Sequence, residues 1–248
     1  MSDYAIFKSN LENIVAYVFI DDDFDFYYHY TKTENVQKIF NSNQIFVSNK
    51  NCMNDKHEVD YPKKLLLSEL NSYGQKQKDG FIEYLYSHWK NDALYSFSVT
   101  SNDNNTYLLN NYGKSIIRIE TKSIKIATVK DYGRPSWRFG KVIYNLAKQK
   151  KIIHKFLKLY FDIEEKQNED ISDDDYEQLE LMQYELINHL CVALDLFKEE
   201  SKYSKEEETR FVFDFEGRTD NTIHENNGKK YIILENIASF AQFHKTIT

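Results

Sequence analysis

Residues 24–34 read FDFYYHYTKTE, and this stretch decides the fold class. Its first half, residues 24–30, is typical of a strand, because bulky aromatic side chains suit a pleated and half-buried surface. Thr31 and Glu34 then have the spacing of a capping box, in which each side chain bonds an orphan amide of the helix start, so a helix should follow to about residue 40. A strand that leads directly into a capped helix indicates a chain of mixed α and β structure.

Further strands are expected on both sides of a long helical part. Apolar and polar residues alternate as in strands over residues 115–120 and 209–215, and residues 231–234 are expected to pair with the second of these. Further strands are expected at 44–48, 93–99 and 141–144. The helical ranges are 4–20, 58–72, 77–90 and about 145–200, with an acidic joint over 163–175. This order indicates an α+β fold with a mixed or antiparallel sheet and inserted helices. We expect one domain over residues 1–248, with a helical insertion at about 145–200.

Composition excludes several classes of protein. A hydrophobic content of 41% argues against a disordered chain, and a net charge of −7 would repel nucleic acid unless a basic patch acts locally. Cys52 and Cys191 match no ligand or redox spacing, so we expect free thiols in a reducing compartment. Residues 1–20 include three charged side chains, unlike a signal peptide, and no run reaches the roughly 20 apolar residues that span a bilayer. We therefore expect a cytoplasmic protein without membrane contact.

Two short patterns place polar side chains together on predicted strands. Ser96 and Ser98 lie two residues apart, so their hydroxyls should point to the same face. The same period should place Glu206, Glu208 and Arg210 on one face at the entry to an aromatic strand. Each pattern also has an ordinary structural explanation, because serine hydroxyls bond neighbouring backbone and charge runs are commonly solvated.

His29 is the third candidate for a functional group. It lies between two tyrosines at a junction of strand and helix, where functional residues are common. A strand histidine is, however, more often a hydrogen-bonded structural residue. His29 therefore gains weight only together with other residues.

Several well-known sites are absent or weak in this sequence. There is no glycine-rich phosphate loop, no GxSxG elbow and no HExxH helix. Asp55, His57 and Glu58 could bind a divalent metal, but they need a distant fourth ligand, and we predict no metal site. A metal-dependent nuclease nevertheless remains an alternative, with a basic patch supplied by Lys148, Lys150, Lys151, Lys155 and Lys158.

Taken in order, five short segments resemble the bacterial domain-of-unknown-function family 2971. They are Tyr28–Thr31, Ile45–Asn49 with Asn54-Asp55 and Glu58, Ser96–Ser98, Tyr112-Gly113, and Glu206-x-Glu208-x-Arg210. The chain departs from that family at Leu109 and Tyr203, where the family commonly has tryptophan, which alters an aromatic wall. More distantly, the order of the segments is similar to that of ADP-ribosyltransferases. This second resemblance implies an ADP-ribosyltransferase-like fold and NAD as substrate.

The resemblance to ADP-ribosyltransferases also implies roles for particular residues. Glu208 would be the catalytic carboxylate, Glu206 would orient the nucleophile, and Tyr112 would stack on nicotinamide. His29 would hold the ribose hydroxyls of NAD. The remaining members of the cofactor site would be Tyr30, Thr31, Ser96, Ser98 and Arg210. The acceptor of ADP-ribose would be an unknown protein or nucleic acid, as in a toxin or a phage-defence effector, and a non-catalytic protein-interaction module with a tyrosine-rich surface is a further alternative.

Overall fold

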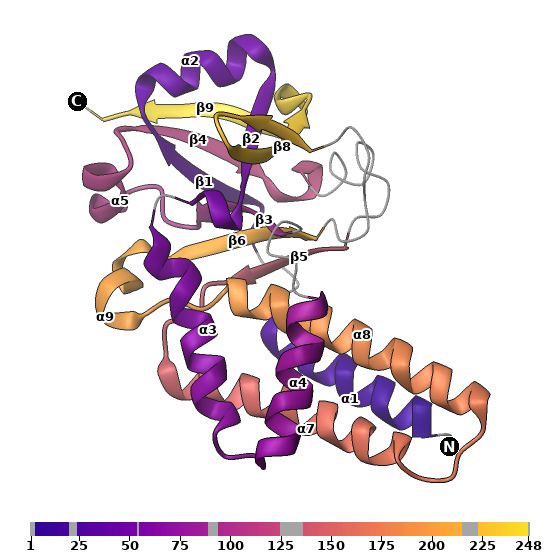
Figure 1. The fold of residues 1–248 in the computed structure, drawn as a ribbon. Helices are drawn as coiled ribbons and strands as arrows, with labels where there is room; N and C mark the ends of the chain where they lie inside the picture. The colour runs from indigo at the N-terminus through magenta and orange to yellow at the C-terminus, as the bar shows by residue number, and fades with distance from the viewer. Residues whose placement is uncertain are drawn as a thin grey trace. The chain divides into compact units, whose positions relative to one another are not determined.

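The computed structural model of the protein describes residues 3–19, 24–53, 55–88, 94–124, 136–214 and 223–247. The chain divides into two compact units (Figure 1). The helical unit takes residues 1–20, 55–90 and 143–200, and the sheet unit takes residues 21–54, 91–142 and 201–248. The helical insertion expected at about 145–200 is thus one of three segments of the helical unit. Asn54, Ala93 and Phe215, which belong to predicted segments, lie outside the described residues.

The helical unit is built from helices whose buried faces follow the helical period. It contains α1 (Asp3–Val18), α3 (Lys56–Leu70), α4 (Gln75–His88), α7 (Leu146–Gln167) and α8 (Asp173–Asp195). Helices α1 and α3 each pack against both α7 and α8. A connection between two long helices is present as predicted, but it is shorter than the expected range of 163–175, because α7 continues to Gln167 and α8 begins at Asp173. Ser172 caps α8 by accepting from the Asp175 amide. The core includes Leu66, Leu70, Phe81, Ile152, Phe156, Leu186 and Leu190.

The sheet unit forms an open antiparallel sheet, which confirms the α+β class. Its strands run in the order β7 (His224–Asn226), β8 (Lys229–Glu235), β2 (Gln44–Asn49), β3 (Leu94–Thr100), β1 (Phe26–Thr31), β4 (Ser115–Glu120) and β9 (Ala241–Thr246). In addition, β6 (Glu208–Asp214) pairs with β3, and β5 (Ser136–Lys141) pairs with β6. Every strand pair in the described residues is antiparallel.

The short helices of the sheet unit lie at its strand connections. They are α2 (Thr33–Ser42), η1 (Lys50–Cys52), α5 (Thr106–Asn111), α9 (Glu200–Tyr203), η2 (Ser204–Glu206) and η3 (Ile237–Ser239). Helix α2 packs over β2 and β4 (Figure 1). The core beneath it includes Tyr27, Val47, Phe97, Ile117, Phe139, Phe211, Phe213, Ile232 and Leu234.

Strand β3 divides one of its two edges between two partners. Strand β6 occupies the first edge along its whole length, from Leu94 to Thr100. On the second edge, β2 pairs opposite Tyr95 and Ser96, whereas β1 pairs only opposite Thr100. The sheet therefore forks beside β3, and backbone groups at the fork need partners other than a neighbouring strand.

Three predictions about the sheet unit are wrong, two about strands and one about the start of helix α2. Strand β8 pairs with β2 and β7, not with β6. The strand expected at residues 141–144 ends at Lys141 and begins earlier, at Ser136, while Ile143 only forms an isolated bridge with Phe197. Helix α2 is not started by a capping box, because its N-cap is Lys32 and Thr31 is the last residue of β1. The Thr31 hydroxyl instead accepts from the Asn35 amide group at 3.1 Å.

Candidate functional site

The candidate site lies in the sheet unit, where the end of β3, the end of β1 and the start of β6 come together. Tyr30 connects two of these segments. Its hydroxyl donates to the Asn102 carbonyl at 2.8 Å and accepts from the Asn105 amide at 2.8 Å. The side chain is only 6% exposed, so burial is the first cause that raises the pKa of Tyr30. Tyr30 is thereby a neutral phenol that fixes the loop after β3.

Asn105 connects that loop to the start of β6. Its side-chain oxygen caps α5 by accepting from the Leu108 amide at 3.0 Å. Its side-chain amide donates to the carbonyls of Lys205 and Glu206 at 2.9 and 3.3 Å. Sequence reasoning missed Asn105, although an asparagine directly before a helical stretch is the usual signal of an N-cap.

Tyr112 and Glu206 form the contact between the α5 segment and η2. The Tyr112 hydroxyl donates to Oε1 of Glu206 at 2.6 Å, a charge-assisted length. Glu206 is 2% exposed, whereas Tyr112 is 47% exposed. The arrangement holds an exposed aromatic ring in one orientation through a buried carboxylate.

Gly113 explains why glycine follows this tyrosine. Its φ of 138° is a conformation that side chains rarely adopt, and an added Cβ would lie 2.4 Å from the carbonyl carbon of Thr31. The turn after α5 therefore packs directly on the backbone at the end of β1. The close approach of the Gly113 backbone to the Thr31 backbone fixes the position of the neighbouring Tyr112.

Glu208 and Arg210 share a face of β6, as the period of two requires. Their side chains form a buried ion pair, with Nε to Oε1 at 2.7 Å and Nη2 to Oε2 at 3.3 Å. The expectation that Glu206 also lies on this face is wrong. Glu206 belongs to η2, and Glu207 has a left-handed φ of 50°, so the backbone turns before the strand begins.

The register of the sheet places the serines beside this ion pair. Ser98 pairs with Arg210, and Thr100 pairs with both Tyr28 and Glu208. Because antiparallel partners point to the same face, Ser96, Ser98, Tyr28, Tyr30, Glu208 and Arg210 share one face. Four of the predicted cofactor residues thus lie on the same face as Glu208, namely Tyr30, Ser96, Ser98 and Arg210.

His29 lies on the opposite face of the sheet. It pairs with Ile117, and its ring lies 4.9 Å from the ring of Phe97 in the core. Its Nδ1 is 3.0 Å from the Ser98 carbonyl at the fork beside β3. Burial lowers the pKa of His29, and the contact with the Ser98 carbonyl opposes that shift only in part. His29 and Glu208, both expected in the NAD site, therefore lie on opposite faces of the sheet, and His29 bonds the backbone at the fork.

The alternative metal site resolves into structural contacts of the helical unit. Asp55 caps α3 by accepting from the His57 amide, and His57 Nε2 lies 2.7 Å from Glu199. Glu58 forms an ion pair with Lys198 at 3.0 Å, and both side chains are at most 9% exposed. Within the described residues, no group of three or more His, Cys, Asp or Glu side chains is arranged to bind a metal ion.

Both cysteines are free thiols, as predicted. In the sheet unit, Cys52 Sγ accepts from the Lys230 amide at 3.2 Å. Among the helices that the structure describes, none combines the length and apolar character needed to cross a membrane.

Comparison with known proteins adds no family. No family model, no curated protein and no solved structure matches the chain. The assignment of function therefore depends on the geometry of the site and on the order of the segments that form it.

Proposed function

We propose that the chain transfers ADP-ribose from NAD to a macromolecular acceptor at the site formed by Tyr112, Glu206 and Glu208. The observation that carries the proposal is the contact of the Tyr112 hydroxyl with the buried Glu206 carboxylate, which leaves the ring 47% exposed. A fixed and exposed ring offers a flat surface on which nicotinamide can stack. Glu206 contacts the hydroxyl of this ring, and Glu208 lies two residues further along the chain, at the start of β6.

The chemistry needs the kind of groups that this site contains. The bond between nicotinamide and C1′ of the ribose breaks, and its electron pair leaves with nicotinamide. Positive charge develops on the sugar, and a placed carboxylate stabilises that charge. The acceptor nucleophile then bonds to C1′ and gives up its proton, for which Glu206 is the proposed base. Glu208, held by Arg210, is the proposed stabiliser of the sugar cation.

The role first assigned to His29 changes in this proposal. Because its ring lies on the core face, His29 supports the sheet beneath Ser98 and does not contact NAD. The Ser98 hydroxyl, on the same face as Glu208 and Arg210, is a candidate contact for the ribose hydroxyls. Thr31 also leaves the proposed cofactor set, because its hydroxyl bonds Asn35.

Release of nicotinamide from NAD tests the proposal directly. We expect the native chain to release nicotinamide in a chromatographic assay, and Glu208→Gln and Glu206→Gln each to slow it at least about 100-fold, as for the loss of one group that stabilises a transition state. Glu235→Gln, which changes an exposed carboxylate on β8, is the matched control. Cleavage by Glu208→Gln at the native rate would remove the assignment.

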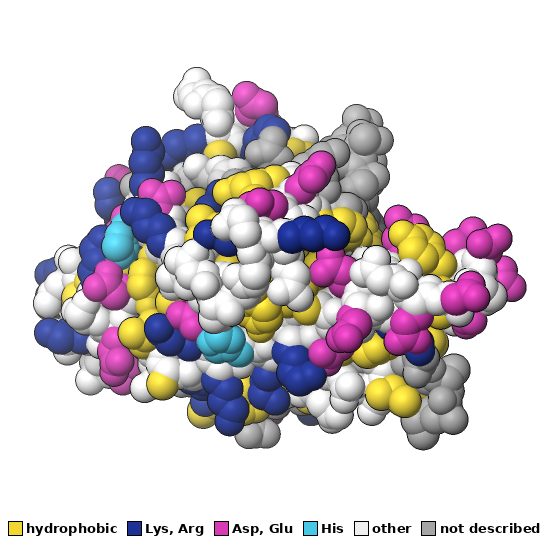
Figure 2. Space-filling view, turned by 60° about the horizontal axis from the view of Figure 1, so that its bottom comes forward, with side chains coloured by type: hydrophobic (Ala, Val, Ile, Leu, Met, Phe, Trp, Pro, Cys, Tyr) yellow, Lys and Arg dark blue, Asp and Glu magenta, His cyan; other side chains and the backbone are white. Residues whose placement is uncertain are grey.

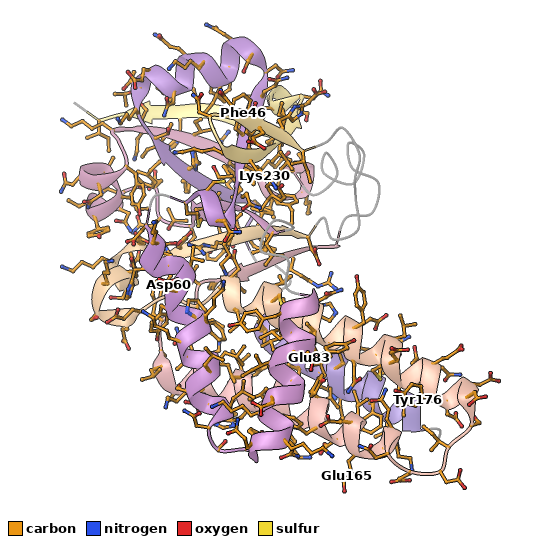
Figure 3. All side chains as sticks on the ribbon, viewed as in Figure 1. Phe46, Asp60, Glu83, Glu165, Tyr176 and Lys230 are labelled. Atoms are coloured by element: carbon orange, nitrogen blue, oxygen red, sulfur yellow. The ribbon has the colours of Figure 1, made fainter. Side chains whose placement is uncertain are left out.

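A protein-interaction module is the second candidate, favoured by an exposed aromatic stack on another part of the sheet unit. Phe46, labelled in Figure 3, is 58% exposed. The centroid of its ring lies 4.8 Å from that of Tyr231, and the ring centroid of His224 lies 5.5 Å from that of Tyr231. These residues come from the adjacent strands β2, β8 and β7. If the native chain releases no nicotinamide, this surface becomes the leading candidate for function.

A further inference from the structure

A tyrosine surrounded by three lysines forms a concentrated positive patch on the helical unit. Tyr17 lies near the end of α1 and is 39% exposed. The Nζ atoms of Lys148, Lys151 and Lys155 lie 5.5, 5.6 and 5.4 Å from the centroid of its ring. The spacings of three and four residues place these lysines on one stripe of α7. We call these four residues the Tyr17 patch.

The other two lysines of the same helix segment differ from those of the patch. Lys150 forms an ion pair with Glu69 at 2.9 Å, and Lys158 forms one with Asp162 at 2.6 Å. Within the parts of the chain that the structure describes, the lysines of the Tyr17 patch have no ion pair with a carboxylate. Their contacts are cation–π contacts with the single ring.

Three ammonium groups around one ring repel one another. Since each lies within 5.6 Å of the same point, no two can be more than about 11 Å apart, which is close to the screening length of about 10 Å at 0.1 M salt. An anion between them would relieve this repulsion. The amino end of the 22-residue helix α7, two residues before Lys148, adds partial positive charge at the same place.

We propose that the Tyr17 patch binds the phosphate groups of a single-stranded nucleic acid. The three lysines supply the backbone contacts, and the Tyr17 ring supplies a face on which a base can stack once the phosphates draw the ammonium groups away. The net charge of −7 opposes binding of nucleic acid elsewhere on the chain. The patch is therefore a local site on an acidic protein.

The charge at the other end of the helices argues against an anionic membrane as the partner. Carboxylates gather where α7 leads into α8 (Figures 2 and 3, with Glu165 labelled in Figure 3). Those in this region are Glu164, Glu165, Glu169, Asp170, Asp173, Asp174 and Asp175. A short strand bound at the patch lies on the amino-terminal half of α7, a helix roughly 33 Å long, and stays away from these carboxylates at its other end, whereas a membrane surface wider than α7 would extend toward them.

Fluorescence anisotropy with a labelled oligothymidylate of 12 nucleotides tests the proposal, and it does not depend on NAD cleavage. The triple variant Lys148→Gln, Lys151→Gln, Lys155→Gln should make the slope of log affinity against log salt shallower by about 2, because each phosphate contact on a single strand contributes about 0.7. The matched control is Lys64→Gln, Lys76→Gln, Lys158→Gln, which changes the net charge equally with exposed lysines of the same unit. It should leave the slope unchanged.

Further variants separate the ring from the charge. Tyr17→Phe should bind as the native chain does, and Tyr17→Ala should bind about tenfold more weakly, as expected for the loss of one stacked base. Lys151→Glu serves as a second variant if circular dichroism shows that the triple variant does not fold. Absence of oligonucleotide binding by the native chain, or equal weakening by the two triple variants, would overturn the proposal.

Two other probes distinguish the source of the phosphate. Tripolyphosphate should compete only weakly, because it offers no base to Tyr17. Vesicles that contain 30% phosphatidylserine should not bind. If the vesicles bind through the three lysines while the oligonucleotide does not, or if tripolyphosphate binds as tightly as the oligonucleotide, the proposal is wrong.

Discussion

The two units of the molecule satisfy their buried polar groups in different ways. In the sheet unit, side chains mostly bond backbone atoms, as Tyr30, His29 and Asn105 do at the end of β3. In the helical unit, a buried ion pair joins Lys198 to Glu58. Helices bond their own backbone except at their ends, whereas a forked sheet leaves backbone groups that need side chains. The bonds at the fork of the sheet unit should thus depend on geometry, and the Lys198–Glu58 pair of the helical unit should depend on charge.

The largest effect is expected from breaking the buried ion pair of the helical unit. Lys198→Met leaves Glu58 without its ammonium partner in a place where little water reaches it. The free energy of unfolding should fall by about 3–5 kcal/mol, as for other buried pairs that lose one partner. Urea denaturation followed by circular dichroism measures this. Adding Glu58→Leu should recover most of the loss, and failure to recover would show that the charge is not the cause.

Substitutions of two glycines test how much the sheet unit depends on its backbone geometry. Gly113→Ala should destabilise the sheet unit by about 3 kcal/mol, because the new Cβ would lie 2.4 Å from backbone carbon and its φ is positive. Gly80→Ala is the matched control in α4, where the nearest atom to a new Cβ is at 3.8 Å. It should stabilise the protein by about 1 kcal/mol through helix propensity. Equal thermal shifts of the same sign would contradict the comparison.

Removing the Tyr30 hydroxyl should show how much the hydrogen bonds from side chains to backbone contribute to the stability of the sheet unit. Tyr30→Phe leaves the Asn102 carbonyl and the Asn105 amide without the bonds that they share with this phenol. Unfolding free energy should fall by about 2 kcal/mol, the cost of unsatisfied buried groups. Tyr86→Phe, at a tyrosine that is 57% exposed, should change it by less than about 0.5 kcal/mol. The same urea experiment compares the two.

A carboxylate of the helical unit should make its stability depend on acid pH. Burial raises the pKa of Glu69, but bonds and charges from Lys150 and His154 outweigh this and lower it overall. A lowered carboxyl pKa gives stability above the unfolded pKa that is lost as pH falls through the folded pKa. Glu69→Gln should therefore cost about 1 kcal/mol at pH 7 and nothing near pH 2. A cost that does not change with pH would rule out charge as its source.

The stability of the sheet unit should depend on pH in a higher range, because of His29. Burial lowers the pKa of His29, so below the ordinary histidine value of 6.5 the unfolded chain binds a proton that the folded chain does not. Stability should fall as pH falls from 7.5 through 6.5 toward the lowered folded value. His29→Gln should remove roughly 1 kcal/mol or less of this dependence between pH 7.5 and 5.5. Parallel pH curves for the native and variant chains would contradict the assignment.

Much of the fold could be predicted because its signals are local. Strand β4 (Ser115–Glu120) agrees with its predicted range, and α7 begins at Leu146, close to the expected residue 145. The expected helical range continues to about 200, whereas α8 ends at Asp195. Strand pairing was less predictable, because the choice of β2 over β6 as the partner of β8 depends on segments distant in sequence. Strand β9 was missed because residues 241–246 alternate only weakly.

The candidate site could be predicted only where two residues stand on one strand. The pairing of Glu208 with Arg210 follows from their spacing, whereas Glu206 departs from it because Glu207 turns the backbone. The sequence could not predict on which face of β1 His29 lies. Aromatic residues occupy both faces of this strand, so no alternation of apolar and polar residues distinguishes them. The role of Asn105 depends on carbonyls 100 and 101 residues away, which no local pattern reveals.

The position of β6 along the chain sets an order of events during synthesis on the ribosome. Strand β3 is made about 110 residues before the partner that fills its whole first edge, and α7 and α8 are made in between. Helices can form from local contacts, whereas long-range strand pairs must wait for both partners. The edge of β3 that β6 will cover therefore stays open while residues 101–207 emerge. This interval is when the nascent chain is most prone to aggregate or to need a chaperone.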